Sequence, residues 1–395
     1  VTGVQRWALP SGPGARGGGH VSGRALVIAW KELLQLRRDR LTLAMMIVLP
    51  VAQLLLFGYA INTDVRHIPT VVFDQDRSAA SRDLARSMQA TGFYDLVGEV
   101  ESYEEIDRAM RSGRARVGLV VPPRFASDVT RGTPASVQLV VDGSDPQIVA
   151  SGLNTASSLV LARSSRVLVT RLGRAGAPLS GEPMRLEPLT LYNPDLRTAV
   201  FVVPGLVGVI LTMTMVMLTA MALARERERG TLEQLIVSPV KKLELVIGKI
   251  VPYIGIGYVQ MSLILGAGHV VFDVPIVGSL PLLYALASLF IAANLALGLF
   301  FSTLAKTQQQ AMQMSFFFLL PNILLSGFMF PFEAMPRPAQ WIAQGLPLTH
   351  FLRIVRGIVL KGSTFPDLVG ELIWLACILV ALIALASARF SKKLV

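Results

Sequence analysis

The stretch RERERGTLEQLIVSPVKKLELVIGK, residues 225–249, lies between two long apolar runs and decides how the chain is organised. It opens with five consecutive charged residues. A bilayer core does not tolerate such a run, because each charge would lose its hydration. After Gly230 the apolar residues follow an amphipathic pattern, which is typical of a short helix lying along a membrane surface. We therefore expect this segment in water between two membrane spans, either as an ordinary loop or as a docking helix for a partner.

The composition indicates a membrane protein. Apolar residues make up 52% of the chain and charged residues only 16%, whereas an ordinary soluble domain carries about 25% charge. Six apolar runs are long enough, at about 20 residues each, to cross a hydrocarbon core about 30 Å thick. They should be helices, because backbone groups in lipid have no water to bond. The expected spans are residues 41–61, 199–224, 250–272, 280–304, 311–332 and 373–388.

The distribution of charge predicts the orientation. Residues 62–197 hold equal numbers of basic and acidic side chains. The basic excess lies in residues 1–40, 225–249, 303–310 and 389–395, and it accounts for the whole net charge of +11. Because short cytoplasmic loops are rich in Lys and Arg, we expect both termini in the cytoplasm and residues 62–197 outside. A nucleic-acid partner is not expected, since the basic residues form no continuous patch.

The N-terminal region divides into two parts. Residues 1–23 are rich in Gly, Ser and Arg and are expected to be a disordered cytoplasmic tail. Residues 24–40 are amphipathic, contain Trp30 and end in a basic cluster. This pattern predicts an interfacial helix that leads into the first span.

Residues 62–197 are expected to form an extracytoplasmic domain. Strand-like runs occur at 71–73, 96–100, 117–121 and 137–141, and helical patterns at 78–89, 103–112 and 145–171. This alternation favours an α/β or α+β domain. Its many charged residues are read as a solvated surface. A substrate or partner site is possible there, but no residue singles one out.

Residues 326–362 cannot continue the fifth span as one helix, because they contain four prolines. Trp341 lies among them, and Trp is favoured at membrane interfaces. The stretch is either a plain outer loop or a set of short helices at the outer interface.

Both stretches resemble sequences of the ABC-2 type transport permeases. The resemblance covers residues 24–395 and implies an elbow helix at 24–40, a coupling helix at 225–240 that receives the stroke of an ATPase subunit, and an outer re-entrant region at 333–362. The residues that match the coupling pattern are Glu226, Glu228, Gly230, Thr231 and Glu233. Those that match the re-entrant pattern are Ser326, Gly327, Pro331, Pro336, Pro347 and Arg356. The large domain after the first span points to the subgroup that carries this insertion.

The chain has no visible energy source of its own. The predicted spans contain no Asp, Glu, Lys or Arg, and no G-x-x-x-x-G-K-[ST] sequence occurs. We therefore expect ATP and Mg²⁺ to bind a separate ATPase subunit. No catalytic or metal-binding constellation is predicted, because the four histidines are scattered and Cys377 is the single cysteine. The chain is not expected to be an enzyme.

Apolar side chains mark the second and fifth spans, which in the ABC-2 permeases line the dimer interface and the export path. Met213 and Met217 lie in the former, and Met312 and Phe316 in the latter. Met suits varied apolar ligands because it is flexible and polarisable. The four residues are either helix packing or part of a substrate path.

Together these patterns predict an α-helical inner-membrane protein with six transmembrane helices, residues 198–395 holding the last five. Its expected function is the permease subunit of an ATP-driven exporter of amphipathic compounds such as drugs, lipids or lipid-linked molecules. Expected partners are the ATPase, a second copy or a sister permease, and the lipid bilayer; a periplasmic adaptor is a further candidate. The alternative is a membrane-anchored sensor or envelope assembly factor that binds a partner through its outer domain.

Overall fold

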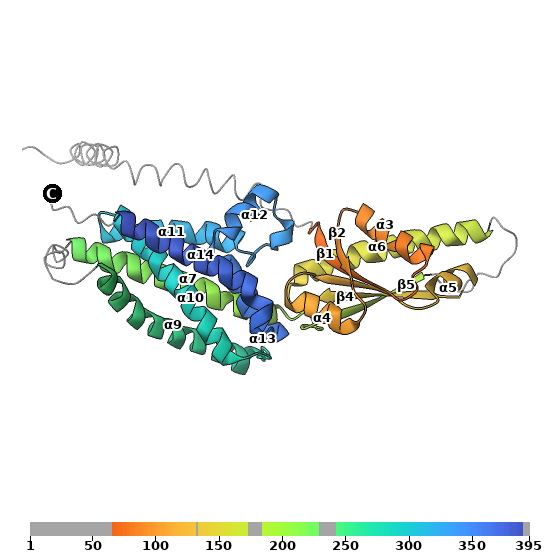
Figure 1. The fold of residues 1–395 in the computed structure, drawn as a ribbon, viewed down its shortest axis with the longest axis horizontal. Coiled ribbons are helices and arrows are strands. Elements are labelled where there is room, and N and C mark those ends of the chain that lie inside the picture. Colours follow the sequence, from red (N-terminus) through yellow and green to blue (C-terminus); the bar gives the residue numbers. More distant parts are fainter. Residues whose placement is uncertain (1–64, 132, 173–183, 229–241, 390–395) are drawn as a thin grey trace, which may run out of the picture. The chain divides into compact units, whose positions relative to one another are not determined.

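The computed structural model describes residues 65–131, 133–172, 184–228 and 242–389 (Figure 1). Four predicted segments therefore lie wholly or mostly outside the described residues. They are the tail 1–23, the interfacial helix 24–40, the first span 41–61 and the coupling helix 225–240.

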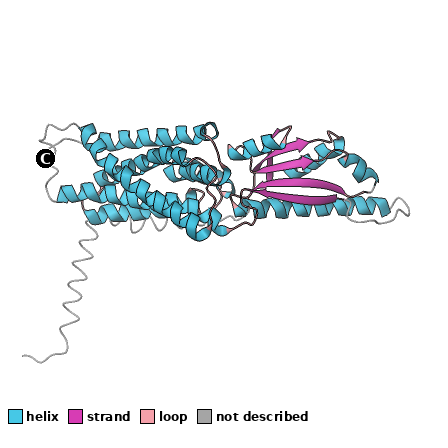
Figure 2. Cartoon of the chain, turned by 90° about the horizontal axis from the view of Figure 1, so that it is seen from below, coloured by secondary structure: helices cyan, strands magenta, loops and turns pink. Residues whose placement is uncertain are grey.

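A five-stranded mixed sheet organises the chain between residues 68 and 191, here called the sheet domain. The strand order is β2-β1-β3-β4-β5, and every pairing is parallel except that of β3 with β4. Figure 2 shows the strands together, with helices around them. In chain order the elements are β1 (Ile68–Asp74), α3 (Ala79–Ala90), β2 (Tyr94–Glu99), α4 (Tyr103–Arg111), β3 (Val117–Val121), α5 (Phe125–Arg131), β4 (Ala135–Asp142), α6 (Pro146–Leu172) and β5 (Met184–Leu191).

The sheet domain has two apolar layers. One is built by β-strand residues with α3, α5 and α6, and the other by the opposite strand face with α4. The central strand β3 is buried along its whole length, as expected for a strand covered on both faces. Local signals set the helix starts: Ser78 and Ser102 accept hydrogen bonds from the N3 amides of α3 and α4.

The sequence located most of these elements. The predicted strands and helices correspond to β1, α3, β2, α4, β3, β4 and α6. It missed α5, which has only seven residues, and β5, in which Pro188 interrupts the strand pattern.

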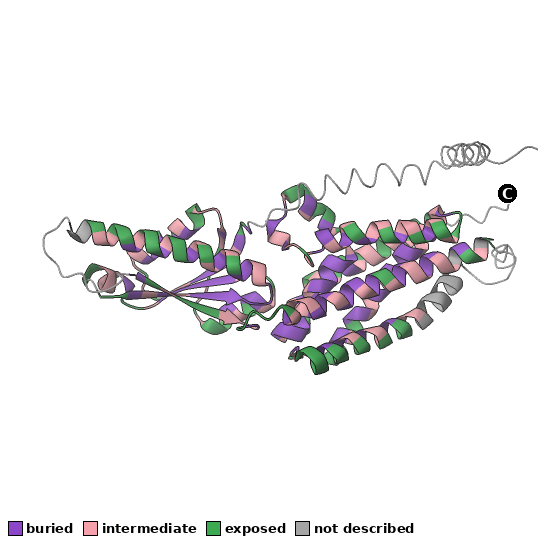
Figure 3. Cartoon of the chain, turned by 180° about the vertical axis from the view of Figure 1, so that it is seen from behind, coloured by how far each residue is buried: buried purple, intermediate pink, exposed green. Residues whose placement is uncertain are grey.

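The remainder of the described chain is helical. Four helices are long and apolar enough to cross a membrane: Thr198–Glu226, Tyr253–Phe272, Leu280–Leu304 and Phe365–Ala388. They lie in α7 (Thr198–Glu228), α9 (Lys242–Phe272), α10 (Leu280–Leu304) and α14 (Phe365–Arg389). The other helical elements are α11 (Gln308–Leu325), η1 (Phe332–Ala334), α12 (Arg337–Gln344) and α13 (Pro347–Lys361). Helix α7 packs against α9, α10, α11 and α13, and one side of α9 is largely exposed in Figure 3.

Two predicted span boundaries change. The fifth predicted span, 311–332, corresponds to α11, which ends at Leu325 because Gly327 adopts φ +85° and turns the chain. The sixth predicted span, 373–388, is part of α14, which begins at Phe365. Asp367 and Glu371 therefore lie in the first turns of α14, before the predicted span, and residues 373–388 themselves hold no charged side chain. Glu371 is accommodated because its carboxylate bonds Arg353 and His350 of α13.

Close packing of α7 on α10 depends on Gly298. A Cβ atom at this position would lie 2.5 Å from the carbonyl oxygen of Val216. We expect Gly298→Val to lower stability by about 1–3 kcal/mol, because the helices must move apart. Thermal unfolding in detergent measures this loss. Gly266→Val is the control, since a Cβ at Gly266 would meet nothing within 4 Å. Equal melting temperatures of the two variants would contradict the packing role.

Candidate functional site

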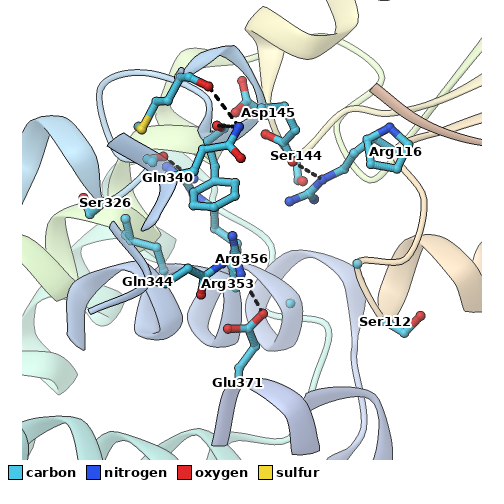
Figure 4. A pocket seen from close by; sticks show the side chains of 18 of the residues that line it. Ser112, Arg116, Ser144, Asp145, Ser326, Gln340, Gln344, Arg353, Arg356 and Glu371 are labelled. Carbon is cyan, nitrogen blue, oxygen red and sulfur yellow. Dashed lines mark hydrogen bonds and ion pairs between the residues drawn. The ribbon is translucent and has the colours of Figure 1, made fainter. Parts of the chain in front are cut away.

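A polar cavity of about 690 Å³ lies where the sheet domain meets α12, α13 and the start of α14 (Figure 4). Side chains of both charge signs line it. From the sheet domain it receives, among others, Ser112, Arg116, Ser144 and Asp145. From the helical part it receives, among others, Ser326, Gln340, Gln344, Arg353, Arg356 and Glu371.

Asp142, at the end of β4, lies at the centre of a network of buried and half-buried charged side chains beside this cavity. It is only 1% exposed. Arg116 Nη1 lies 2.8 Å from its Oδ2, and Lys361 of α13 pairs with the same oxygen. Arg116 Nε also lies 3.3 Å from Glu333 Oε1 in η1. We call Asp142, Arg116, Lys361 and Glu333 the Asp142 network; it joins the sheet domain to the helical part.

The charges of the Asp142 network compensate one another. Burial by itself would raise the pKa of Asp142, but Lys361 and Arg116 outweigh burial and hold it well below its usual range. Asp142 is therefore a carboxylate at neutral pH. Removing one member of such a set leaves an uncompensated charge. The stability lost in this way is much larger than the stability that the intact pair contributes.

Backbone acceptors strengthen the same junction. Lys361 Nζ donates to the carbonyl of Met110, 3.2 Å away, and Ser363 Oγ donates to the carbonyl of Arg111 at 3.0 Å. Both carbonyls belong to the last turn of α4, where intrahelical donors are missing and a cation is favoured. Gln147 Nε2 adds a third link, to the carbonyl of Met329 at 3.2 Å.

A second cluster connects α12, α13 and α14. His350 is fully buried; its Nε2 lies 2.9 Å from the carbonyl of Gln344, and its Nδ1 lies 2.6 Å from Glu371 Oε2. The carbonyl can only accept, so the Nε2–H of His350 donates to it. Arg353 Nη1 bonds the other oxygen of Glu371 at 3.0 Å. The cluster fixes the two short helices on the last span.

The predicted re-entrant residues lie at helix ends around this site, except Arg356, which lies within α13. Gly327 and Arg356 come together, because Arg356 Nη1 donates to the Gly327 carbonyl at 3.1 Å. Ser326 is the buried C-cap residue of α11. Three prolines stand where short helices start: Pro331 before η1, Pro336 before α12 and Pro347 as the first residue of α13. Of these six residues, Ser326, Gly327, Pro336 and Arg356 line the cavity.

The predicted coupling residues are only partly described. Glu228 is exposed at the end of α7, and its carboxylate accepts from the backbone N of Gln308 at 2.8 Å and from Gln308 Nε2 at 2.5 Å. These bonds hold the pKa of Glu228 below its usual value. Glu226 is half-buried, whereas Gly230, Thr231 and Glu233 lie outside the described residues. Glu228 thus connects α7 to the first turn of α11.

The predicted path residues lie on the two helices expected to carry them. Met213 of α7 is exposed and Met217 is half-buried. Met312 and Phe316 are exposed on α11 and continue into Leu320, at a spacing of four residues that places them on one helical face. The sequence had not singled out Leu320.

Comparison with known proteins identifies the family. Residues 40–388 match the family described as ABC-2 family transporter protein. The chain belongs to the ABC-2 family.

Several bacterial permeases resemble this ABC-2 protein over most of its length. It is 29% identical to the "probable multidrug ABC transporter permease YbhS" of Escherichia coli, over 94% of this chain and 97% of that protein. It is 30% identical to the "probable multidrug ABC transporter permease YbhR" of the same organism, over 92% and 97%. With the E. coli "inner membrane transport permease YhhJ" the identity is 28%, over 82% and 86%. This ABC-2 protein is therefore a multi-pass transport permease of the inner membrane, and its family implies a partner ATPase subunit.

The sequence did not reveal the Asp142 network of this ABC-2 permease. Asp142 closes the apolar end of β4 and Lys361 closes the apolar end of α13, so each is a charge beside a buried run. That was the available signal. Their pairing spans 219 positions in the chain, and no local pattern encodes it.

Proposed function

We propose that this chain is the membrane subunit of an ATP-driven ABC-2 exporter that moves amphipathic compounds outward. It works as a dimer with itself or a sister permease, and a separate ATPase subunit binds ATP and Mg²⁺. The observation that carries the proposal is the family match over residues 40–388, which includes the charged segment 225–249 and the re-entrant region.

The cargo class is proposed from two features. The relatives YbhS and YbhR are named multidrug permeases, and α7 and α11 present exposed Met and Phe side chains. Such side chains adapt to varied apolar surfaces. Drugs, lipids and lipid-linked compounds all have an apolar part, which these Met and Phe side chains would contact.

We propose that movement is transmitted across the membrane through two contacts described above: that of Glu228 with Gln308, and the Asp142 network. Segment 225–240 receives the ATPase stroke, and Glu228 passes it to α11 through Gln308. The Asp142 network fixes the sheet domain, which lies outside the membrane, to α13. Glu226, Gly230, Thr231 and Glu233 are proposed to shape the docking segment, where the sequence predicts that Thr231 caps a helix.

The proposed orientation predicts a labelling pattern. In a Cys377→Ala background, Val97→Cys should react with an impermeant thiol reagent added to intact cells, because Val97 is exposed on the sheet domain. Val240→Cys should react only after the cells are opened. Reversed labelling would contradict the proposed topology and the placement of the ATPase partner.

The proposed division of labour predicts that the purified chain neither binds nor hydrolyses ATP, since it has no phosphate-binding loop. A tagged chain should co-purify with a Walker-type ATPase. Specific nucleotide binding by the isolated chain, at roughly micromolar affinity, would refute the proposal. Capture of an envelope protein with no ATPase would instead favour a sensor or assembly factor.

A further inference from the structure

Three uncharged polar side chains inside the helical part have buried atoms without a hydrogen-bond partner. They are Thr212 of α7, Asn294 of α10 and Asn322 of α11, and each is only 1% exposed. The Thr212 hydroxyl, the side-chain oxygen of Asn294 and both polar atoms of the Asn322 amide are unpaired within the described parts of the chain. Buried polar atoms are nearly always paired, so these exceptions need an explanation.

Contacts at two levels align α7 with α10. At one level the rings of Phe290 and Phe351 stack with centroids 4.0 Å apart, and a Cβ atom on Gly208 would lie 3.2 Å from Phe351 Cδ1. About two turns further along each helix, a Cβ atom on Gly298 would lie 2.5 Å from the carbonyl oxygen of Val216. The two helices, which lie side by side in Figure 1, therefore run in the same direction. Residues midway between these contacts lie at one level.

Thr212 and Asn294 are these midway residues, and α11 brings Asn322 to the same level. Helix α11 runs in the opposite direction, because Gln308 at its start bonds Glu228 at the end of α7. Thr212 and Asn322 each lie about four helical turns from that bond. The three unpaired side chains thus gather at one depth of the bundle, on three helices that pack together.

This depth is close to the middle of the membrane. Thr212 stands at the centre of the candidate span Thr198–Glu226, and Asn294 lies near the centre of the candidate span Leu280–Leu304. The hydrocarbon core supplies no water to an unpaired polar group, so such a group is costly there. Protein atoms cover the unpaired atoms, so water does not reach them in this arrangement of the helices either.

Helix α11 has a point at which it can bend at this level. Pro321, directly before Asn322, lies inside the helix. A proline there removes one backbone hydrogen bond and weakens the helix locally. The inner end of α11 is held by the bond of Gln308 to Glu228, and the outer end packs on α12 and α13. The middle of α11 is therefore the part that can move away from α7.

We propose that α11 bends at Pro321 and separates from α7 at this level, giving the chain a second arrangement in which Thr212 and Asn322 are hydrated. The hydration of the unpaired atoms offsets the apolar contacts that are lost, so the second arrangement lies within a few kcal/mol of the first and is measurably populated. The inference goes beyond the exporter proposal, because it needs neither the ATPase nor a cargo.

Thiol labelling of the purified full-length chain in detergent tests the opening. In the Cys377→Ala background, Thr212→Cys should react with a small water-soluble thiol reagent on the order of tenfold faster than Ala293→Cys. Ala293 is the matched control, since it is fully buried, lies next to Asn294 and belongs to the apolar core. Both substitutions change the side-chain volume little.

Two further substitutions test the cause. Asn322→Leu keeps the size and removes the unpaired amide. It should raise the melting temperature by about 2 °C and slow the labelling of Thr212→Cys on the order of tenfold, because the closed arrangement no longer carries that cost. Pro321→Ala should also slow the labelling, since it restores a backbone donor to α11. Asn154→Leu, at an exposed position of α6, should change neither quantity.

Equal labelling of Thr212→Cys and Ala293→Cys would overturn the proposal. So would a lower melting temperature of Asn322→Leu, which would show that the amide is paired in the folded chain. A higher melting temperature with unchanged labelling would show a static packing defect and would also overturn it. If Asn322→Leu does not fold, Pro321→Ala decides through its labelling rate.

Discussion

Asp142→Asn is expected to lower the free energy of unfolding by about 3 kcal/mol, because Lys361 and Arg116 then share no buried carboxylate. The lowered pKa of Asp142 gives the sign of the pH dependence. Its contribution is complete above the unfolded-state pKa of an Asp and is lost as the pH falls toward the lower folded-state value. The loss at neutral pH is therefore due to the substitution itself. Thermal unfolding of the full chain in detergent, with limited proteolysis of the sheet domain, measures it.

Two further variants test the cause. Asp83→Asn removes an exposed carboxylate that pairs with Arg163, and it should leave the melting temperature nearly unchanged. Combining Asp142→Asn with Lys361→Met should recover part of the loss, because the uncompensated ammonium is also removed. If Asp142→Asn proves as stable as Asp83→Asn, the Asp142 network does not hold the junction.

Glu226→Lys combined with Glu228→Lys is expected to leave an inserted, stable permease whose ATPase partner is no longer stimulated. The reversed charge cannot accept from Gln308, so the end of α7 loses its bonds to the first turn of α11. We expect stimulation and export of an amphipathic dye to fall on the order of tenfold, the usual scale of a coupling free energy. Membrane yield, melting temperature, ATP hydrolysis and dye export are measured together.

Glu228→Gln is the matched variant for this experiment. Its amide oxygen can still accept from the backbone N of Gln308, so it should retain much of the stimulation that the double variant loses. Full export by a stably inserted double variant would argue decisively against a coupling role for these carboxylates. Loss of insertion would show that they serve folding instead.

The sequence predicted what depends on composition and local periodicity. Long apolar runs marked the helices that are now candidate spans, and β-branched runs marked β1, β3 and β4. Short or interrupted elements were harder to predict, as α5 and β5 illustrate. The predicted sixth span began only at residue 373, whereas α14 begins at Phe365 and carries Glu371, whose carboxylate bonds His350 and Arg353.

The cavity was beyond local prediction for a different reason. Arg356 was found only through a family pattern, and Asp145 only as the expected start of a helix. Both residues line the cavity although they lie far apart in the sequence, and no periodicity encodes such a separation. The contact of Glu228 with Gln308 could not be predicted locally either, since it joins the end of α7 to the start of α11, which are far apart in the sequence.

The most direct test of the exporter account is the rate of ATP hydrolysis by the co-purified ATPase, reconstituted in liposomes with and without this chain. The account predicts faster hydrolysis with the chain, a further change on adding amphipathic compounds, and loss of both effects with the double Lys variant. Hydrolysis that is indifferent to the chain, in a complex shown to be intact, would contradict the account.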